Sequence, residues 1–361
     1  MNKITYFDVL IVYTETIATS ASDSSKENLT PFPSGSRNES YNIVYSYFLE
    51  ICEKLKLKAA FTTSADIIGP GSCQSFWIFK NKKWQKVNSP CFSSLIFDKF
   101  SPIRPNVKIG RKLLFSSDEV KPFNDPDLFN LFFDKQLTYN KLATHSIPTI
   151  SLEENTLESI NDACETLNKI VGYHSHPKDF SSDLIMKDRF GAGGKRIYKF
   201  KSGDSKNMLA TINKNPNFSF ILQPFTNFDK GFNYNNCHAA TDIRLVYLKG
   251  KIIQSYIRVA KSGEFRCNEH QGALLTYVSQ KEIPPILIEK SNLIAKILDK
   301  KCSLYALDFI ISNSGKPYLL EGNTGPGLDW NLSLKKNEIK SKKLIRLVVE
   351  ELSIRAKTQV L

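Results

Sequence analysis

The sequence predicts a protein of the α/β (α+β) class with two domains, and three observations support this prediction. Its 361 residues are enough for two domains of roughly 150 residues each, and its hydrophobic content of 41% is ordinary for a globular protein. The first part of the chain begins with a strand–helix–strand pattern, and the second part continues with helices and buried strands. The stretch KPFNDPD between them favours loop structure, so we expect domains at 1–122 and 123–361.

The elements of the first part follow from local patterns. An apolar, β-branched run over 4–13 predicts a strand, and Ser, Thr, Asn, Pro and Gly crowd the stretch 20–40, which predicts a long loop. Apolar residues recur at helical spacing over 41–56, and buried strands are predicted at 58–61 and 94–97. This order predicts a β-α-β unit at the start of the chain.

The second part shows the same two kinds of element, in an order that favours a parallel or mixed sheet. Helices are predicted near 127–144 and 156–170, and a long amphipathic helix at 335–357 is expected to be a packed surface helix with a charged face. The predicted strands are 183–187, 218–223, 243–248, 251–259, 304–311 and 317–321.

The charge balance favours an acidic partner. Lys and Arg number 49 against 36 Asp and Glu, which gives a formal net charge of +13. Such a charge attracts nucleotide phosphates, a carboxylate substrate, nucleic acid or an anionic membrane surface, and the charge alone does not choose among them. Nucleic acid is the less favoured partner, because the chain lacks an aromatic and basic motif of the RNA-binding type.

The remaining composition favours a cytoplasmic protein. No stretch approaches the ~18 to 20 consecutive apolar residues that a membrane-spanning helix needs. The apolar start contains Asp8 and is followed by Glu15, which favours a strand over a secretory signal. The seven cysteines are scattered and form no CxxC pair, as expected for reduced thiols. We therefore expect no membrane partner, no disulfide framework and no zinc site.

A glycine-rich turn follows one of the predicted strands. The strand DLIMK ends at Lys187 and runs into DRFGAGGKRIY, which contains Gly191, Gly193 and Gly194. A lysine beside bare backbone N–H groups can cradle a phosphate. A glycine-rich hairpin turn is the alternative, because the spacing fits neither the P-loop nor the dinucleotide fingerprint.

A second motif lies near the end of the chain, in ALDFIISNSGKPYLLEGNTGPGLDW. Two strands joined by the turn 313–315 would place Asp308 on one strand and Glu321 and Asn323 on the next, so that their side chains converge. Such oxygen donors suit Mg²⁺, which takes one or two carboxylates together with phosphate oxygens and water. The alternative is a strand-end cap and a solvated residue, but both carboxylates stand in apolar runs, where an unpaired charge is costly.

Taken in order along the chain, these motifs resemble the ATP-grasp superfamily, and most closely its ribosomal-protein glutamate ligases and glutathione synthetase-like carboxylate-amine ligases. The resemblance covers about 127–354. It implies an ATP-grasp fold with an N-terminal α/β pre-ATP-grasp domain, a central lid lobe at about 145–225 and a C-terminal metal-binding lobe at about 226–361. The matching segments are Asp134-Lys135, Lys187 with the glycine turn, Ile221–Phe225, Asp242-Ile243-Arg244, Phe265–Asn268, Asp308, Glu321, Asn323 and Pro326-Gly327.

The resemblance also implies roles for individual residues. It places Lys187 and Arg266 at the reacting centre, with two Mg²⁺ ions, or Mn²⁺ in their place, on Asp308, Glu321 and Asn323. The residues that it implies for ATP binding are Lys135, Lys187, Gly191, Gly193, Gly194, Gln223, Pro224, Phe225, Asp242, Arg266 and Asn268. Pro224 departs from the family pattern, which has Glu there, and a proline has no N–H to donate. Cys267 is expected to be a spacer that points away from the site.

Substrate recognition is expected in the first domain and near the FRCN segment. Arg37, Lys99 and Arg104 carry charges that would face a cleft at the carboxyl ends of the strands, and His270 follows Arg266 closely. Solvated surface charges are the alternative for Lys99 and Arg104.

The resemblance implies an ATP-dependent ligase that joins a carboxylate to an amine through an acyl phosphate and releases ADP and phosphate. ATP, a carboxylate and an amine, on an amino acid, a peptide or a protein terminus, are then the partners, and a homo-oligomer is compatible with this activity. Two alternatives stay open: a nucleotide-binding regulatory module without turnover, and a small-metabolite ligase of the glutathione synthetase or D-alanine-D-alanine ligase kind.

Overall fold

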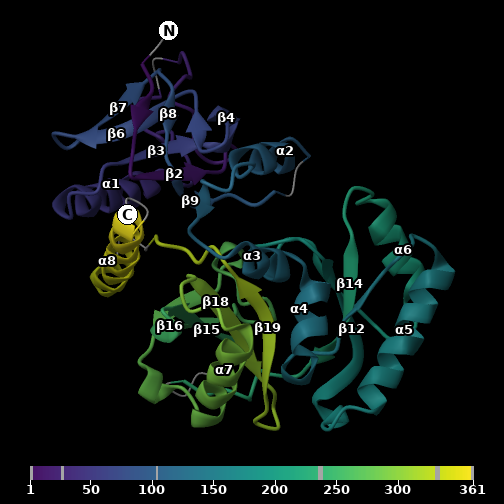
Figure 1. Ribbon diagram of the computed structural model, residues 1–361. Coiled ribbons are helices and arrows are strands. Elements are labelled where there is room, and N and C mark those ends of the chain that lie inside the picture. The colour runs from purple at the N-terminus through teal and green to yellow at the C-terminus, as the bar shows by residue number, and fades with distance from the viewer. Residues whose placement is uncertain (1–2, 26–27, 103–104, 235–238, 330–333, 359–361) are drawn as a thin grey trace. The chain divides into compact units, whose positions relative to one another are not determined.

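The chain forms two compact units in the computed structural model (Figure 1). The described residues are 3–25, 28–102, 105–234, 239–329 and 334–358. The first unit comprises 1–126 together with 325–361, and the second comprises 127–324. The chain therefore leaves the first unit, builds the second, and returns to the first.

A six-stranded sheet forms the centre of the first unit. Its strands lie in the order β10-β9-β2-β3-β6-β7, with parallel pairing from β10 to β3 and antiparallel pairing from β3 to β7. Helix α1 (Tyr41–Lys54) connects the parallel neighbours β2 and β3, which confirms the predicted β-α-β unit. The strands are β2 (Val9–Tyr13), β3 (Ala59–Thr63), β6 (Phe76–Lys80), β7 (Lys83–Val87), β9 (Leu95–Lys99) and β10 (Lys121–Pro122).

A smaller sheet accompanies it, and it changes one prediction. The run 4–13, expected as one strand, is two strands in different sheets, because the chain bends at Asp8, whose carboxylate accepts the N–H of Lys58 at 2.6 Å. The small sheet has the order β1-β8-β5-β4, with β1 (Thr5–Tyr6), β4 (Ile67–Gly69), β5 (Ser72–Cys73) and β8 (Cys91–Phe92).

The last helix belongs to the first unit, whereas the sequence analysis assigned it to the second domain. Helix α8 (Lys335–Thr358) lies against α1, and Nε of Arg346 donates a hydrogen bond to the Tyr47 hydroxyl at 2.7 Å. Its apolar face is buried, at Leu344, Ile345, Val348, Val349 and Leu352. Helix α2 (Pro105–Leu114) also belongs to this unit.

The predicted helix at 127–144 is two helices in the structure. Asp134 ends the first and caps the second, because its carboxylate accepts the N–H groups of Gln136 at 2.9 Å and Leu137 at 3.4 Å. The helices in this part of the chain are α3 (Pro126–Phe133), α4 (Lys135–Leu142), α5 (Leu157–Gly172), α6 (Ser205–Asn213) and α7 (Pro285–Leu298).

Two sheets build the second unit, and every strand pairing described in them is antiparallel, so the predicted parallel or mixed plan is wrong here. The reason is local: tight turns such as Lys249-Gly250, both with positive φ, join strands that are consecutive in the sequence. The four-stranded sheet is β11 (Ile150–Ser151), β14 (Phe220–Thr226), β12 (Phe180–Asp188) and β13 (Ile197–Phe200). The five-stranded sheet is β17 (Leu274–Tyr277), β16 (Lys251–Val259), β15 (Thr241–Leu248), β18 (Tyr305–Ile311) and β19 (Pro317–Asn323).

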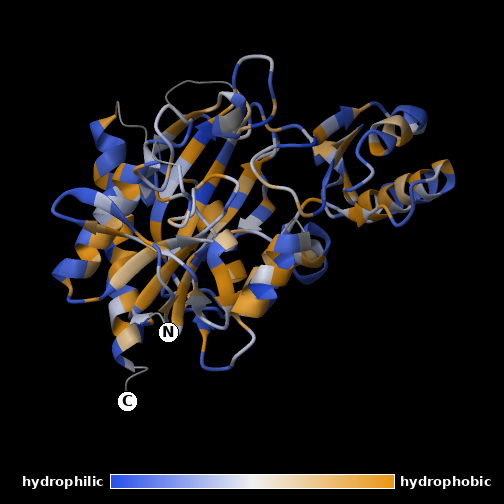
Figure 2. Cartoon of the chain, turned by 90° about the horizontal axis from the view of Figure 1, so that it is seen from above, coloured by the Kyte–Doolittle hydropathy of each residue, from blue (hydrophilic) through white to orange (hydrophobic). Residues whose placement is uncertain are grey.

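Each sheet of the second unit has one apolar and one polar face. The four-stranded sheet buries Leu184, Met186 and Leu222 in a core that α5 and α6 complete. The five-stranded sheet buries Ile243 and Leu307 in a core that α7 completes. Because side chains alternate along a strand, the opposite faces carry the polar residues between these positions. The strands are accordingly mostly hydrophobic in Figure 2, with hydrophilic positions between.

Candidate active site

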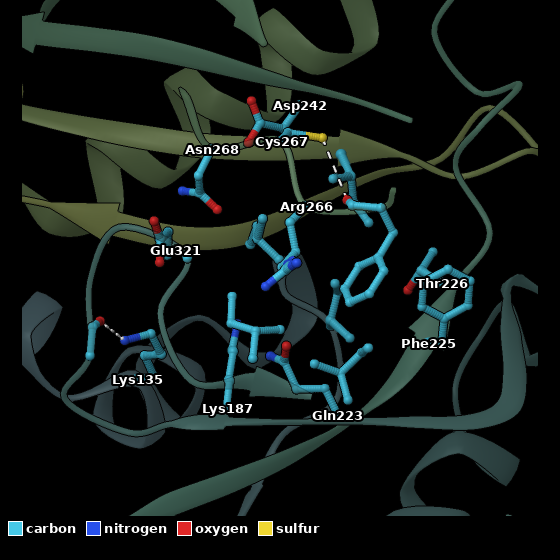
Figure 3. A pocket seen from close by; sticks show the side chains of 18 of the residues that line it. Lys135, Lys187, Gln223, Phe225, Thr226, Asp242, Arg266, Cys267, Asn268 and Glu321 are labelled. Carbon is cyan, nitrogen blue, oxygen red and sulfur yellow. Dashed lines mark hydrogen bonds between the residues drawn. The ribbon is translucent and has the colours of Figure 1, made fainter. Parts of the chain in front are cut away.

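A cavity with an empty volume of about 850 Å³ lies in the second unit (Figure 3). Side chains from β12, β14, β15, β16 and β19 line it, together with α4, the glycine turn and the FRCN segment. All eleven residues that the sequence analysis named for ATP binding line it: Lys135, Lys187, Gly191, Gly193, Gly194, Gln223, Pro224, Phe225, Asp242, Arg266 and Asn268.

Lys187 reaches the cavity from β12. Ile185 and Lys187 share one face of the strand, and Ile185 is paired with Gln223 on β14, so Gln223 faces the same way. The Gln223 amide donates to the Thr149 hydroxyl at 2.7 Å, which fixes its orientation. Lys187 is only 5% exposed. Burial lowers its pKa to about 8, against the opposing effect of Glu321.

Lys135 supplies a second cation, at the start of α4. Arg189 donates two hydrogen bonds, at 2.8 and 2.7 Å, to the two carboxylate oxygens of Asp134 and so ties α4 to the glycine turn. The Lys135 ammonium donates to the carbonyl of Gly191. Burial lowers the pKa of Lys135 as well. Two lysines from separate elements are thus held beside the same turn.

The glycine turn depends on its glycines. Gly193 and Gly194 have φ of +69° and +71°, a backbone region that side chains disfavour. A Cβ on Gly194 would lie 2.4 Å from Oδ1 of Asn268, so only a glycine allows this close approach. Nε of Arg196 donates to the Asp188 carboxylate at 2.8 Å and closes the base of the turn. The turn is the loop of the β12–β13 hairpin, and Gly194 packs directly against Asn268.

Four buried charges form a network on the polar face of the five-stranded sheet. Arg258 donates two hydrogen bonds to Asp242, at 2.8 and 2.7 Å, and one to Asp308, at 2.8 Å. Arg244 donates to both carboxylate oxygens of Asp308. All four residues are buried. Sequence reasoning missed Arg258 and gave Arg244 no role, although charged residues at alternate positions of apolar strands were a signal for such pairing.

The proposed metal ligands lie next to this network. Asp308 is opposite Glu321 in the β18–β19 pairing, and Asn323 follows on the same face of β19. Burial opposes ionisation of Asp308, but Arg244 and Arg258 outweigh it and hold the pKa of the carboxyl below its ordinary value.

The oxygen donors fit Mg²⁺ better than a transition metal. In the part of the chain that the structure describes, no group of three or more His, Cys, Asp or Glu side chains could hold a metal ion. Glu321 and Asn323 supply one carboxylate and one amide, and the oxygens of Asp308 are shared with its two arginines. A site with few protein ligands suits Mg²⁺, which fills its coordination shell with phosphate oxygens and water.

The FRCN segment closes another side of the cavity. Arg266 binds the Glu264 carboxylate at 2.6 Å, and this hydrogen bond lowers the pKa of Glu264 to about 2. Nε of Arg266 and Oγ1 of Thr226 are buried, with no hydrogen-bond partner among the described residues. Both residues line the cavity, so a polar ligand can use these two atoms (Figure 3).

Cys267, predicted to be a spacer that points away from the site, is among the residues that line the cavity. The thiol is buried and donates to the carbonyl of Ala240 at 3.4 Å, and burial raises its pKa. The structure places the backbone of His270 in a short 3-10 helix, Glu269–Gln271, and its side chain lies outside the described part.

The other residues expected to recognise substrate belong to the first unit, and the lining of the cavity belongs to the second. The Lys99 ammonium donates to the carbonyls of Gly325 and Pro326 at 3.1 and 2.8 Å. Arg37 is exposed in the loop before α1. Arg104 lies outside the described residues.

Two antiparallel sheets with a glycine turn, two lysines and a carboxylate-bearing hairpin around one cavity define an ATP-grasp domain. Residues 133–348 match the RimK-like ATP-grasp domain family, and the chain belongs to this family. This confirms the predicted superfamily and the α/β (α+β) fold class.

Relatives of known sequence carry a related name. A "Probable alpha-L-glutamate ligase" from Legionella pneumophila (strain Corby) is 30% identical over 198 residues, which are 54% of this chain and 56% of the relative. The protein of the same name from Shewanella halifaxensis is 30% identical over 217 residues, 60% of this chain and 41% of the relative. The matches thus span about half of the length of these relatives.

Solved structures share the fold at low sequence identity. The D-cycloserine synthetase DcsG has a TM-score of 0.56 at 12% identity and covers 95% of this chain and 99% of its own. D-alanyl-alanine synthetase A from Vibrio cholerae has a TM-score of 0.56 at 14% identity, with coverages of 98% and 99%. The ATP-grasp ligase PsnB, complexed with a minimal precursor, has a TM-score of 0.51 at 11% identity, with coverages of 96% and 99%.

Proposed function

We propose that this protein is an ATP-dependent carboxylate-amine ligase. In this reaction the terminal phosphoryl group of ATP passes to a carboxylate oxygen and gives an acyl phosphate and ADP. An amine then attacks the acyl carbon, phosphate leaves with the carboxylate oxygen, and a proton leaves the nitrogen. The observation that supports this most is that one cavity is lined by two lysines, a guanidinium whose buried Nε–H has no hydrogen-bond partner among the described residues, and the Glu321 carboxylate of the β18–β19 hairpin.

The two lysines and the glycine turn would bind the phosphates. Lys135 lies on α4 and Lys187 on β12, so the two ammonium groups would contact a polyphosphate chain at two different points. The glycine turn adds backbone N–H groups and covers the site, which protects an acyl phosphate from water. Phosphoryl transfer needs such positioning and charge neutralisation more than covalent help from the protein.

Strand β14 would bind the adenine base. Gln223, Pro224 and Phe225 line the cavity in one segment. Pro224 has no N–H, so hydrogen bonds there would come from carbonyl groups or from the N–H of Phe225. The apolar lining from Ile185 and Ile310 suits the faces of a base.

Glu321, Asn323 and Asp308 would hold magnesium. When bound with the nucleotide, Mg²⁺ neutralises phosphate charge and orients the transferred group. Arg244 and Arg258 keep Asp308 ionised and fix its orientation, so it can serve as a ligand only with the oxygen lone pairs that the arginines leave available.

Arg266 would stabilise the charge that develops during transfer. Its guanidinium is anchored to Glu264 through one terminal nitrogen, and its buried Nε–H is left for a ligand. A donor fixed in this way needs no reorganisation during the reaction, which is how charged transition states are stabilised best.

We infer that glutamate is one of the two substrates. The support is the name of the relatives from Legionella and Shewanella, which match 54% and 60% of this chain. The other substrate would be an amino acid, a peptide or a protein terminus. PsnB, which shares the fold, was captured with a precursor, so the fold accommodates a peptide in that protein.

The experiment is ADP formation by the purified protein with ATP, Mg²⁺ and glutamate, against separate pools of amino acids and short acidic peptides. Turnover that requires glutamate and one pool supports the proposal, and Glu321→Gln should lower it about 100-fold or more. Glu289→Gln, an exposed carboxylate on α7 in the same unit, should leave it within about twofold.

The other outcomes separate the alternatives. Turnover with D-alanine or another small metabolite, but not with glutamate, would indicate a small-metabolite ligase. Tight ATP binding without turnover in any pool would indicate a regulatory nucleotide-binding module and contradict the proposed activity.

A further inference from the structure

A second cavity, with an empty volume of about 1100 Å³, lies in the first unit and shares no residue with the nucleotide cavity. It is found at the amino ends of the parallel strands, among β1, the end of α1, the start of β3 and the β6–β7 hairpin. Ligands of open α/β sheets bind at the opposite, carboxyl ends. The cavity therefore calls for a separate explanation.

The cavity forms because the sheet opens between β3 and β6. The two strands pair at Phe61 and Trp77. Continued pairing would bring Ala59 opposite Phe79, but both of these residues line the cavity instead. In an antiparallel hairpin with a two-residue turn, only every second residue of β6 directs its N–H and C=O toward β7. Phe79 is one of the residues between these, so its N–H and C=O point away from β7 and into this gap. The gap thus presents backbone groups that an extended peptide can bind.

The floor of the cavity is apolar. Phe7, Phe76 and Val87 line it, and Phe76 is 3% exposed. Apolar surface in an open cavity is favourable to cover, at about 25 cal/mol per Å² removed from water. A large apolar side chain would therefore gain free energy by entering.

The rim is strongly basic. Lys56, Lys58 and Lys80 line the cavity, and Glu53 is the acidic side chain in its lining. Three more lysines are their near neighbours in the sequence: Lys54, Lys82 and Lys83. Among the described residues, none of these six lysines forms an ion pair.

Part of this positive charge opposes folding. Lys80 and Lys83 are directly paired across the β6–β7 hairpin, where like charges are destabilising. An anionic partner would relieve this repulsion, because each lysine would gain an opposite charge without moving from the rim. The charge of the rim therefore complements an acidic ligand.

We propose that this cavity binds an acidic peptide segment that carries a large apolar side chain. The lysines of the rim meet the carboxylates, the apolar floor takes the side chain, and the open gap beside Phe79 takes the peptide backbone. A partner peptide or protein would be recognised here in addition to the reaction at the nucleotide cavity.

The test is a binding titration of the full chain without ATP, followed by fluorescence anisotropy. The probe is a fluorescein-labelled peptide of alternating Glu and Leu with one central Phe. The variant replaces Lys56, Lys58 and Lys80 by Glu, and the matched control replaces Lys108, Lys112 and Lys121, exposed lysines of the same unit, by Glu. We expect the Kd of the first variant to rise about tenfold or more and that of the control to stay within about threefold.

A second probe separates specific binding from general attraction to basic surface. A peptide in which Ser replaces Leu and Phe, with the same number of Glu, should bind the wild-type protein about tenfold more weakly. Equal binding of both peptides, or an equal loss of binding in both triple variants, would overturn the proposal. Binding of decanoate, a fatty acid anion, without binding of either peptide would overturn it as well. Thermal unfolding midpoints of the variants show that they are folded. A negative result leaves the ligase proposal intact, because no nucleotide is present.

Discussion

Replacement of Arg258 by methionine tests whether the buried charges beside the nucleotide cavity are stable only as a set. Arg258 donates two hydrogen bonds to Asp242 and one to Asp308. After the substitution, Asp308 keeps Arg244, whereas Asp242 loses both of these hydrogen bonds and stays buried. Removal of one partner of a buried ion pair costs about 3 to 5 kcal/mol, because it leaves an uncompensated charge. We expect a loss of this size in the free energy of unfolding.

The assay is urea unfolding at pH 7, followed by circular dichroism. A double variant, Arg258→Met with Asp242→Asn, removes the uncompensated charge and should recover about half of the loss. As a control, Arg346→Met removes an exposed guanidinium with one hydrogen bond to Tyr47 and should cost less than about 1 kcal/mol. A loss below about 1 kcal/mol in Arg258→Met, or a double variant no more stable than the single one, would refute the reasoning.

Three further predictions concern the nucleotide cavity. The pKa of Lys187 is lowered to about 8, so ATP affinity should fall as the pH rises through 8, because the ammonium loses its charge. In calorimetric titrations between pH 7 and 9.5, the variant Lys187→Arg should show no such fall. Gly194→Ala should weaken ATP binding about tenfold, because its Cβ would meet Asn268, and Gly203→Ala, with open space around it, should not. Asp134→Ala removes the α4 cap and the Arg189 pair, and should lower unfolding free energy by about 1 to 3 kcal/mol in urea titrations.

Local patterns were sufficient to predict the elements that carry the site. Strand 251–259 was predicted with its observed bounds, and the hairpin that holds Asp308 and Glu321 was predicted from its turn and its apolar strands. The break at Asp134 was missed because apolar spacing continues across it, and only the capping geometry ends the helix there.

The features that local patterns could not predict depend on contacts between distant segments. Arg258 meets Asp242 and Asp308 only through the register of three strands, which alternation within one strand does not determine. The place of α8 in the first unit likewise depends on its contact with α1, far away in the sequence.

The central claim is that a carboxylate is activated by phosphoryl transfer. The most direct test uses the substrate pair that supports ADP formation, with the substrate carboxylates labelled with ¹⁸O one substrate at a time, and mass spectrometry of the phosphate released. An acyl phosphate requires that one ¹⁸O atom passes from the activated carboxylate into each phosphate. Unlabelled phosphate with both labelled substrates would contradict the account, because it would show that water, and not a carboxylate, receives the phosphoryl group.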